Sequence, residues 1–149
     1  MPIAAELPAL TAAMKDFAVQ RGFDDIAVTL GLVPHAADGE TISLRMPLTD
    51  ALAQANGMFS AAALFGAADI TGTFLAMQAY TESGHFPLAV QSNQHYLANS
   101  RAEFAVATAR MVRSGGNVAV VEVAVDDAQH KPLMRATFTY VLAARIPGR

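Results

Sequence analysis

One carboxylate stands alone in the most apolar stretch of this chain. Asp69 lies near the middle of SAAALFGAADITGTFLAM, which begins at Ser60. If the stretch is helical, residues three or four apart share one face. The face of interest carries Ala62, Gly66, Asp69 and Thr73. Small neighbours leave space for a ligand and a water molecule, and burial raises the pKa of a carboxyl group toward the range that suits a general base.

A purely structural explanation of Asp69 stays open beside this catalytic one. A hydrogen bond alone can keep a carboxylate in a core, for example one to Thr73, one turn further on, or to a polar side chain of a sheet. Small residues on a helix face can equally serve close packing against another element. In both cases the carboxylate requires some partner, because an unpaired charge in a core is costly.

The stretch around Asp69 is predicted to form one long helix, from about Ser60 to Glu82. Ser60 is a suitable N-cap, and Gly84 is a suitable stop signal after the last turn. A helix that is hydrophobic on all sides must be buried among other elements. The rest of the chain therefore has to supply its cover.

That cover is predicted to be one amphipathic helix and a set of short strands. Apolar residues at helical spacing over 3–21, with Gly22 after them, indicate the N-terminal helix. The strand-like runs are IAVTLGLV from Ile26, TISLRMPL from Thr41, and then LAVQSNQHYL, AEFAVATARMV, NVAVVEVAV and PLMRATFTYVL in the last third. Their short connectors, including the Asp38-Gly39 turn, suit antiparallel hairpins. We expect one α+β domain over 1–149, with a five- or six-stranded antiparallel sheet curved around the apolar helix.

Composition excludes several classes of function. Hydrophobic residues make up 53% of the 149 and charged residues 15%, a balance that favours self-association. A net charge of −3 argues against a nucleic-acid partner, and the absence of cysteine excludes disulfides and thiolate metal sites. The four histidines are widely spaced, so no metal is expected. The N-terminus does not have the pattern of a signal peptide, and polar residues interrupt the one stretch long enough for a membrane span. A cytoplasmic location away from the membrane is expected.

Three local patterns, in this order, resemble those of the hotdog-fold thioesterase superfamily. They are NGMFSAAALFGAAD, SNQHYLANS and ARMVRSGGNVAVVEVAVDDAQHKPLMRATFTY. The chain most resembles the branch of the phenylacetate-pathway acyl-CoA thioesterases and related small proteins, over about residues 25–143. That resemblance implies a homodimer or a homotetramer built as a dimer of dimers, with an acyl-CoA thread passing between subunits and no cofactor.

The resemblance also implies roles for single residues. Asp69 aligns with the carboxylate that activates water or attacks the thioester carbon. The backbone N–H groups at the start of the helix, here those of Ala61 and Ala62, polarise the thioester oxygen. Gly57 matches an upstream glycine of the family. Asn56 is the candidate for the family's catalytic asparagine, with Gln54 as an alternative.

The chain departs from the family where His-Gly-Gly is replaced by Ser60-Ala61-Ala62. The histidine helps to position substrate, and alanine narrows the approach of a thioester to the backbone. This departure favours the alternative function, a non-catalytic hotdog module that binds acyl-CoA or another apolar ligand. GHFP at 84–87 coincides with a motif of hotdog dehydratases, but it follows the helix that it should precede, so we interpret it as chance.

Four further residues are predicted to bind substrate. Asn93 and His95 are placed along the ligand tunnel, although a solvent-facing position on a strand explains them equally well. Arg113 and Ser114 lie in a glycine-containing turn that can hold the phosphates of coenzyme A, and ordinary hairpin duty is the alternative. Lys131 and Arg135 are weaker candidates for that duty. The predicted reaction is hydrolysis of an acyl thioester to acid and thiol.

Overall fold

The long apolar helix lies at the centre of the molecule. The computed structural model describes residues 3–81 and 84–144. The central helix, α3, spans Ala61–Ala79, and the Ser60 side chain caps it by accepting a hydrogen bond from the Ala63 N–H at 3.1 Å. The predicted N-cap is therefore confirmed. The helix ends at Ala79, and the predicted last residue, Glu82, lies outside the described residues.

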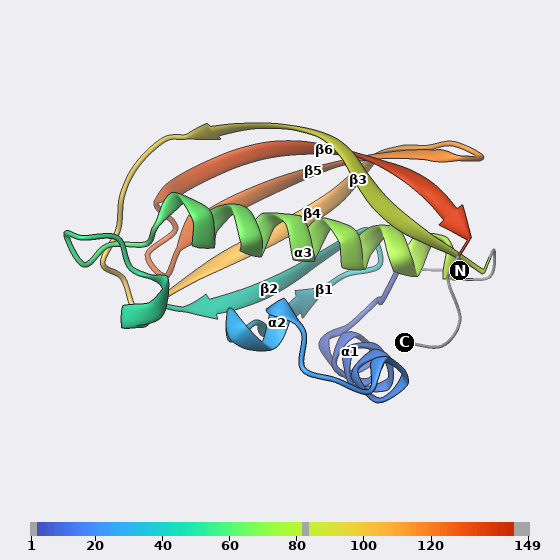
Figure 1. Ribbon diagram of the computed structural model, residues 1–149, viewed down its shortest axis with the longest axis horizontal. Coiled ribbons are helices and arrows are strands. Elements are labelled where there is room, and N and C mark those ends of the chain that lie inside the picture. The colour runs from blue at the N-terminus through green and yellow to red at the C-terminus, as the bar shows by residue number, and fades with distance from the viewer. Residues whose placement is uncertain (1–2, 82–83, 145–149) are drawn as a thin grey trace.

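One antiparallel sheet wraps around α3 (Figure 1). Its strands are β1 (Val33–Ala37), β2 (Thr41–Pro47), β3 (His85–Tyr96), β4 (Phe104–Ser114), β5 (Val118–Asp127) and β6 (Pro132–Ala144). Their order across the sheet is β1-β2-β4-β5-β6-β3, and every neighbouring pair is antiparallel. The α+β class and the predicted sheet around a central helix are confirmed. Strand β3 forms one edge of the sheet.

The first predicted strand is wrong in its position. Ile26–Thr29 forms a short helix, α2, and β1 begins only at Val33. Asp25 initiates α2, because its carboxylate accepts a hydrogen bond from the Ala27 N–H at 3.0 Å. The alternation of Ile26 and Val28 therefore reflects two exposed side chains on a helical turn rather than one face of a strand.

Two more elements precede α3. Helix α1 spans Leu7–Arg21, so the predicted helix over 3–21 begins four residues later than expected, and it ends as predicted at Gly22, whose φ of 76° is left-handed. Leu10 is its buried residue. A short 3-10 turn, Asp50–Leu52, leads toward α3. No helix within the described ranges reaches the length and apolarity that crossing a membrane demands.

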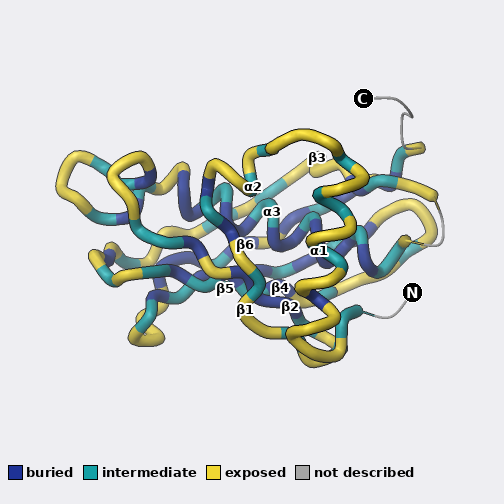
Figure 2. The backbone as a smooth tube through the Cα atoms, turned by 90° about the horizontal axis from the view of Figure 1, so that it is seen from below, coloured by how far each residue is buried: buried dark blue, intermediate teal, exposed yellow. Residues whose placement is uncertain are grey.

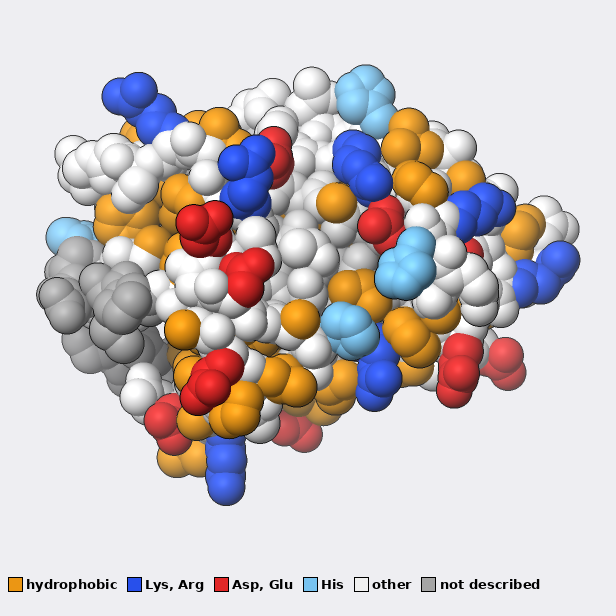
Figure 3. Space-filling view, turned by 180° about the vertical axis from the view of Figure 1, so that it is seen from behind, with side chains coloured by type: hydrophobic (Ala, Val, Ile, Leu, Met, Phe, Trp, Pro, Cys, Tyr) orange, Lys and Arg blue, Asp and Glu red, His pale blue; other side chains and the backbone are white. Residues whose placement is uncertain are grey.

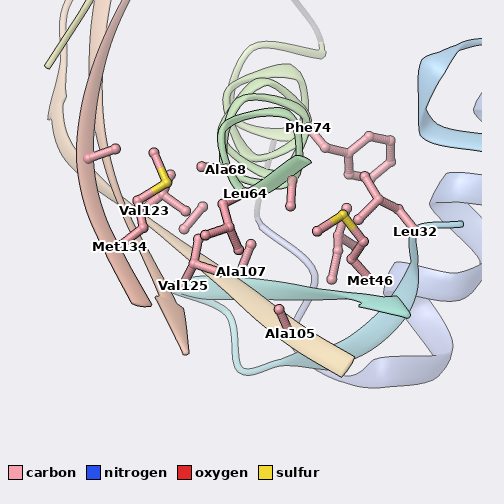
Figure 4. Packing of buried hydrophobic residues seen from close by; sticks show 14 of the residues in the cluster. Leu32, Met46, Leu64, Ala68, Phe74, Ala105, Ala107, Val123, Val125 and Met134 are labelled. Atoms are coloured by element: carbon pink, nitrogen blue, oxygen red, sulfur yellow. The ribbon is translucent and has the colours of Figure 1, made fainter. Parts of the chain in front are cut away.

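The core lies between α3 and the inner face of the sheet. Figure 2 shows the buried positions gathered there, with α1 and α2 largely exposed outside it. Small alanines of β4, including Ala105 and Ala107, let α3 approach closely. In Figure 4, Leu64 points from α3 toward Ala107 and Val125. The sheet thus holds the helix, and with it Asp69, in a fixed orientation.

Candidate active site

The first turn of α3 offers two free hydrogen-bond donors. The Ser60 hydroxyl accepts a hydrogen bond from the Ala63 N–H at 3.1 Å, and the Ser60 carbonyl oxygen accepts one from the Leu64 N–H at 3.0 Å. Within the described part of the chain, no acceptor meets the N–H groups of Ala61 and Ala62. Both residues are exposed. Together with the positive end of the helix dipole, the two N–H groups form a suitable site for a developing oxyanion.

Asp69 is half-buried, and its carboxylate receives no hydrogen bond from any described residue. Burial raises the pKa of Asp69 above its ordinary value. The Thr73 hydroxyl, the partner considered above, donates instead to the Tyr140 hydroxyl at 3.4 Å. An ionisable group in such surroundings is available as a base or a nucleophile.

Tyr140 fixes the turn of α3 that carries Asp69, a role that the sequence did not reveal. Its hydroxyl donates a hydrogen bond to the backbone carbonyl of Asp69 at 3.2 Å, and its side chain is fully buried. Burial raises the pKa of Tyr140 well above its ordinary value, and the nearby Asp69 charge adds to this effect. The phenol is therefore a fixed donor. A Cβ atom on Gly72 would lie 2.6 Å from the Tyr140 Oη, so glycine permits this approach.

A second group without a partner lies on the same flank of α3. Gln94 pairs with Ala136 on the neighbouring strand β6, and Ala136 pairs on its other side with Val123 of β5. Val123 packs against Gly72 of α3. Because residues opposite each other share a face, the Gln94 side chain points to the helix side of the sheet. Its Oε1 is buried, and no described group donates to it. Gln94 was missed because polar residues occupy both faces of this strand.

Asn93 and His95 lie on the other face of the same strand. They are opposite Thr137 and Arg135, which point away from α3. Within one chain the sheet therefore separates them from Asp69. The face on which each β3 side chain lies depends on the pairing irregularity between Ala89 and Gln91, which the sequence alone does not show.

The space predicted beside Gly66 is occupied. A Cβ atom there would lie 2.9 Å from the Leu30 Cδ1, so Gly66 allows α2 to pack closely on α3. At this position the packing explanation of the small residue applies.

The loop before α3 holds the other candidates from the first pattern. Gly57 has a φ of 77°, and its N–H donates to the Gln54 carbonyl at 2.8 Å. The Gln54 side chain accepts from the Asn56 N–H, and Arg101 binds the Asn56 carbonyl at 2.7 Å. These contacts fold the loop into a tight turn on the same side of the molecule as the free donors of α3.

Arg113 and Ser114 lie at the opposite end of α3. The Ser114 Oγ is 2.9 Å from the Tyr80 hydroxyl, which also donates to the Gly115 carbonyl at 2.6 Å. Tyr80 follows Asp69 by eleven residues, or about 16 Å along the helix axis. Within one chain, this turn is therefore remote from the carboxylate and from the free donors.

The donors and the carboxylate are also too far apart to serve one thioester within a single chain. Seven to eight residues separate Asp69 from Ala62 and Ala61, about 11 Å along the axis. The reacting carbon and oxygen of a thioester are bonded to each other, so both groups must lie within about 3 Å of neighbouring atoms. Within one chain, the carboxylate and the donors therefore do not form one site. Among the described residues, no cluster of three His, Asp or Glu side chains is placed to hold a metal ion.

Comparison with known proteins gives a fold but no sequence relative. No family model matches the chain, and no curated protein matches it. A thioesterase from Pseudomonas aeruginosa, solved as a mutant, superimposes with a TM-score of 0.79 at 21% identity, over 88% of this chain and 93% of that one. A Haemophilus influenzae thioesterase gives 0.80 at 17% identity, over 93% and 90%. The E. coli PaaI protein of the phenylacetic acid degradation operon gives 0.73 at 19% identity, over 91% and 94%. The chain has the hotdog fold of these proteins.

Proposed function

We propose that this hotdog-fold chain hydrolyses an acyl-CoA or a similar thioester to a carboxylic acid and a free thiol. The observation that carries the proposal is a half-buried carboxylate without a partner among the described residues, on the same helix as two free backbone donors. The three superimposed proteins support it, because two are described as thioesterases and the third belongs to a degradation operon for an aromatic acid.

In the proposed reaction, Asp69 acts as general base. It takes a proton from water while the water oxygen bonds to the thioester carbon, and the resulting oxyanion accepts hydrogen bonds from Ala61 and Ala62. Collapse of this intermediate breaks the carbon–sulfur bond, and the thiolate takes the proton from Asp69. In the nucleophilic variant of this step, the carboxylate attacks the carbon itself, the carbon–sulfur bond breaks, and the thiolate leaves as a mixed anhydride forms. Water then hydrolyses the anhydride to the acid and a free Asp69, and the proton that is released goes to the thiolate.

We further propose that two chains pair through β3 and that each supplies half of a site. Among the described strands β3 contacts only β6, which leaves its outer row of backbone groups available for another chain. Leu88 and Val90 on this edge strand are 50% and 59% exposed. A pairing of this kind buries them and brings the free donors of one α3 toward Asp69 of the other.

The proposal is tested with Asp69→Asn. Thiol release is measured with short, branched, aromatic and long acyl-CoA substrates, and the unfolding midpoint is recorded in parallel. We expect turnover to fall by about 100-fold or more while the fold is retained. Asp24→Asn, which removes an exposed carboxylate on the loop before α2, is the matched control and leaves turnover unchanged. Undiminished hydrolysis by Asp69→Asn refutes the assignment.

One observation favours a second function, in which the chain binds a thioester without cleaving it. The Ser60 hydroxyl is engaged in capping α3, so it does not take over the substrate-positioning task that the resemblance gives to histidine. In that case calorimetry detects acyl-CoA binding while no substrate of the panel releases thiol. Release of thiol that depends on Asp69 rules this function out.

A further inference from the structure

The outer face of the sheet, opposite to α3, carries two adjacent rows of polar side chains. One row runs through Ser43, Thr108, Ala124, Arg135 and His95, across five strands. The next row runs through Thr41, Arg110, Glu122, Thr137 and Asn93. Figure 3 shows this face, where charged and histidine side chains lie around a recessed area.

All of these residues except Ser43 line a hollow of about 460 Å³. The floor is low because Thr108, Ala124 and Thr137 are small. The walls carry Arg110 on one side and Arg135 on the other. Solvated outer faces of sheets need no such depression, and this one is lined by polar and charged groups.

Each arginine is now held by a carboxylate, and Arg135 leans toward Asp126, away from Arg110, so both guanidinium groups must leave these partners to meet one anion. They stand on β4 and β6, two strands and one row apart, so their Cα atoms are separated by about 12 Å. Arg110 binds Glu122 through Nε and Nη2, and Arg135 binds Asp126 through Nη1 at 2.9 Å. The Arg110 Nη1 and the Arg135 Nε and Nη2 have no acceptor within the described ranges. Both ion pairs are substantially exposed, so they contribute little stability and exchange readily with a competing anion.

We propose that this hollow binds a phosphorylated small molecule. A phosphate group has three outer oxygens and can accept hydrogen bonds from two guanidinium groups that approach from different sides, whereas a carboxylate presents one edge. The remaining volume accommodates a group of sugar size, whose hydroxyls meet Thr108, Thr137 and Asn93. The site does not depend on the proposed hydrolysis, because the sheet lies between it and Asp69.

Calorimetric titration tests the site with inorganic phosphate, glucose 6-phosphate, glucose and adenosine 3′,5′-bisphosphate. We expect the sugar phosphate to bind and glucose not to bind. Tighter binding of the bisphosphate than of the sugar phosphate assigns the hollow to the nucleotide end of coenzyme A, and the reverse order assigns it to a free metabolite. Absence of binding by every phosphate compound overturns the proposal.

Variants with opposite expected signs separate a built site from general charge effects. Arg110→Gln weakens binding by about tenfold, because a charge-assisted hydrogen bond is lost. Glu122→Gln strengthens it, because Arg110 is released and a negative charge leaves the hollow. Glu6→Gln, the same change at the residue before α1, has no effect, and equal strengthening by Glu6→Gln and Glu122→Gln overturns the proposal.

Filling the floor provides a test that leaves every charge in place. The side chain at position 124 points away from the core, so Ala124→Leu fills the hollow and abolishes binding. Thr139 lies on the same outer face of the sheet but outside the hollow, so Thr139→Leu leaves binding unchanged. Unfolding midpoints of both variants confirm that the fold persists. If Ala124→Leu binds phosphate with unchanged affinity, the site is contradicted. The same holds if the only effect of Ala124→Leu is a change of oligomeric mass.

Discussion

Replacement of Gly72 by alanine tests the contact between Tyr140 and the turn of α3 that carries Asp69. The new Cβ atom would lie 2.6 Å from the Tyr140 Oη and 3.4 Å from the Val123 Cγ2, so the phenol must move. Overpacking of a core costs about 1–3 kcal/mol. Loss of the hydrogen bond to the Asp69 carbonyl leaves the buried Tyr140 hydroxyl without an acceptor for its proton, although Thr73 still donates to it, and this costs about 1–3 kcal/mol more. Alanine returns about 1 kcal/mol through its helix propensity.

The net expectation for Gly72→Ala is a loss of about 1–5 kcal/mol in the free energy of unfolding. The assay is urea denaturation of Gly72→Ala, Tyr140→Phe and the double variant. Removal of the hydroxyl leaves the Tyr140 Cζ as the nearest ring atom, at 3.6 Å from the new methyl group, which is ordinary contact. The double variant is therefore more stable than Gly72→Ala alone. Strict additivity of the two single effects refutes the reasoning, because it means that the two groups do not meet.

Two further predictions concern Asp69 and the edge strand. Burial holds the pKa of Asp69 above 3.8, so kcat/KM rises with pH through that higher value. The free energy of unfolding of Asp69→Asn, compared with that of the parent, has the matching pH dependence. The difference shifts in favour of the variant as pH rises from 4 to 7, and a difference that does not change with pH contradicts the burial of Asp69. Val90→Lys on β3 shifts the chain from dimer to monomer in light scattering and lowers turnover with it. A fully active monomer contradicts the shared site.

The sequence predicted the architecture because its strongest signals are local and consistent with one another. A helix that is apolar on every side must be buried on every side, and strands joined by short connectors must be antiparallel. The error at Ile26 has a local cause as well. Four residues of alternating hydrophobicity fit a strand and a capped turn equally well, and the carboxylate of Asp25 decides between them.

The site was less readable because it depends on contacts between distant segments. Asp69 was found by its contrast with its neighbours. Tyr140 was missed because its hydroxyl reaches α3 only after β6 has paired with β5 and β3. On β3, one irregularity in pairing decides whether Gln94 or its neighbours face α3, because it reverses the face of every residue beyond it. Positions that depend on register require the fold.

The separation of Asp69 from the proposed oxyanion donors leads to a sharp test by complementation. Ala61→Pro removes one N–H donor at the first position of α3, where proline is well tolerated and where Ser60 already has an extended conformation. We expect this variant and Asp69→Asn each to be inactive or severely impaired as homodimers. In a mixed dimer, the Asp69 of one chain meets the intact donors of the other, so one of the two sites is complete.

Random mixing of equal amounts of the two variants therefore restores about a quarter of the wild-type activity, since half of the dimers are mixed and each holds one working site. Refolding the variants together, with each refolded alone as the control, measures this recovery. If Asp69 instead works with the donors of its own chain, every mixed dimer contains two broken sites and mixing restores nothing. The helix geometry predicts recovery, because about 11 Å of rigid α3 keeps the two halves apart within each chain.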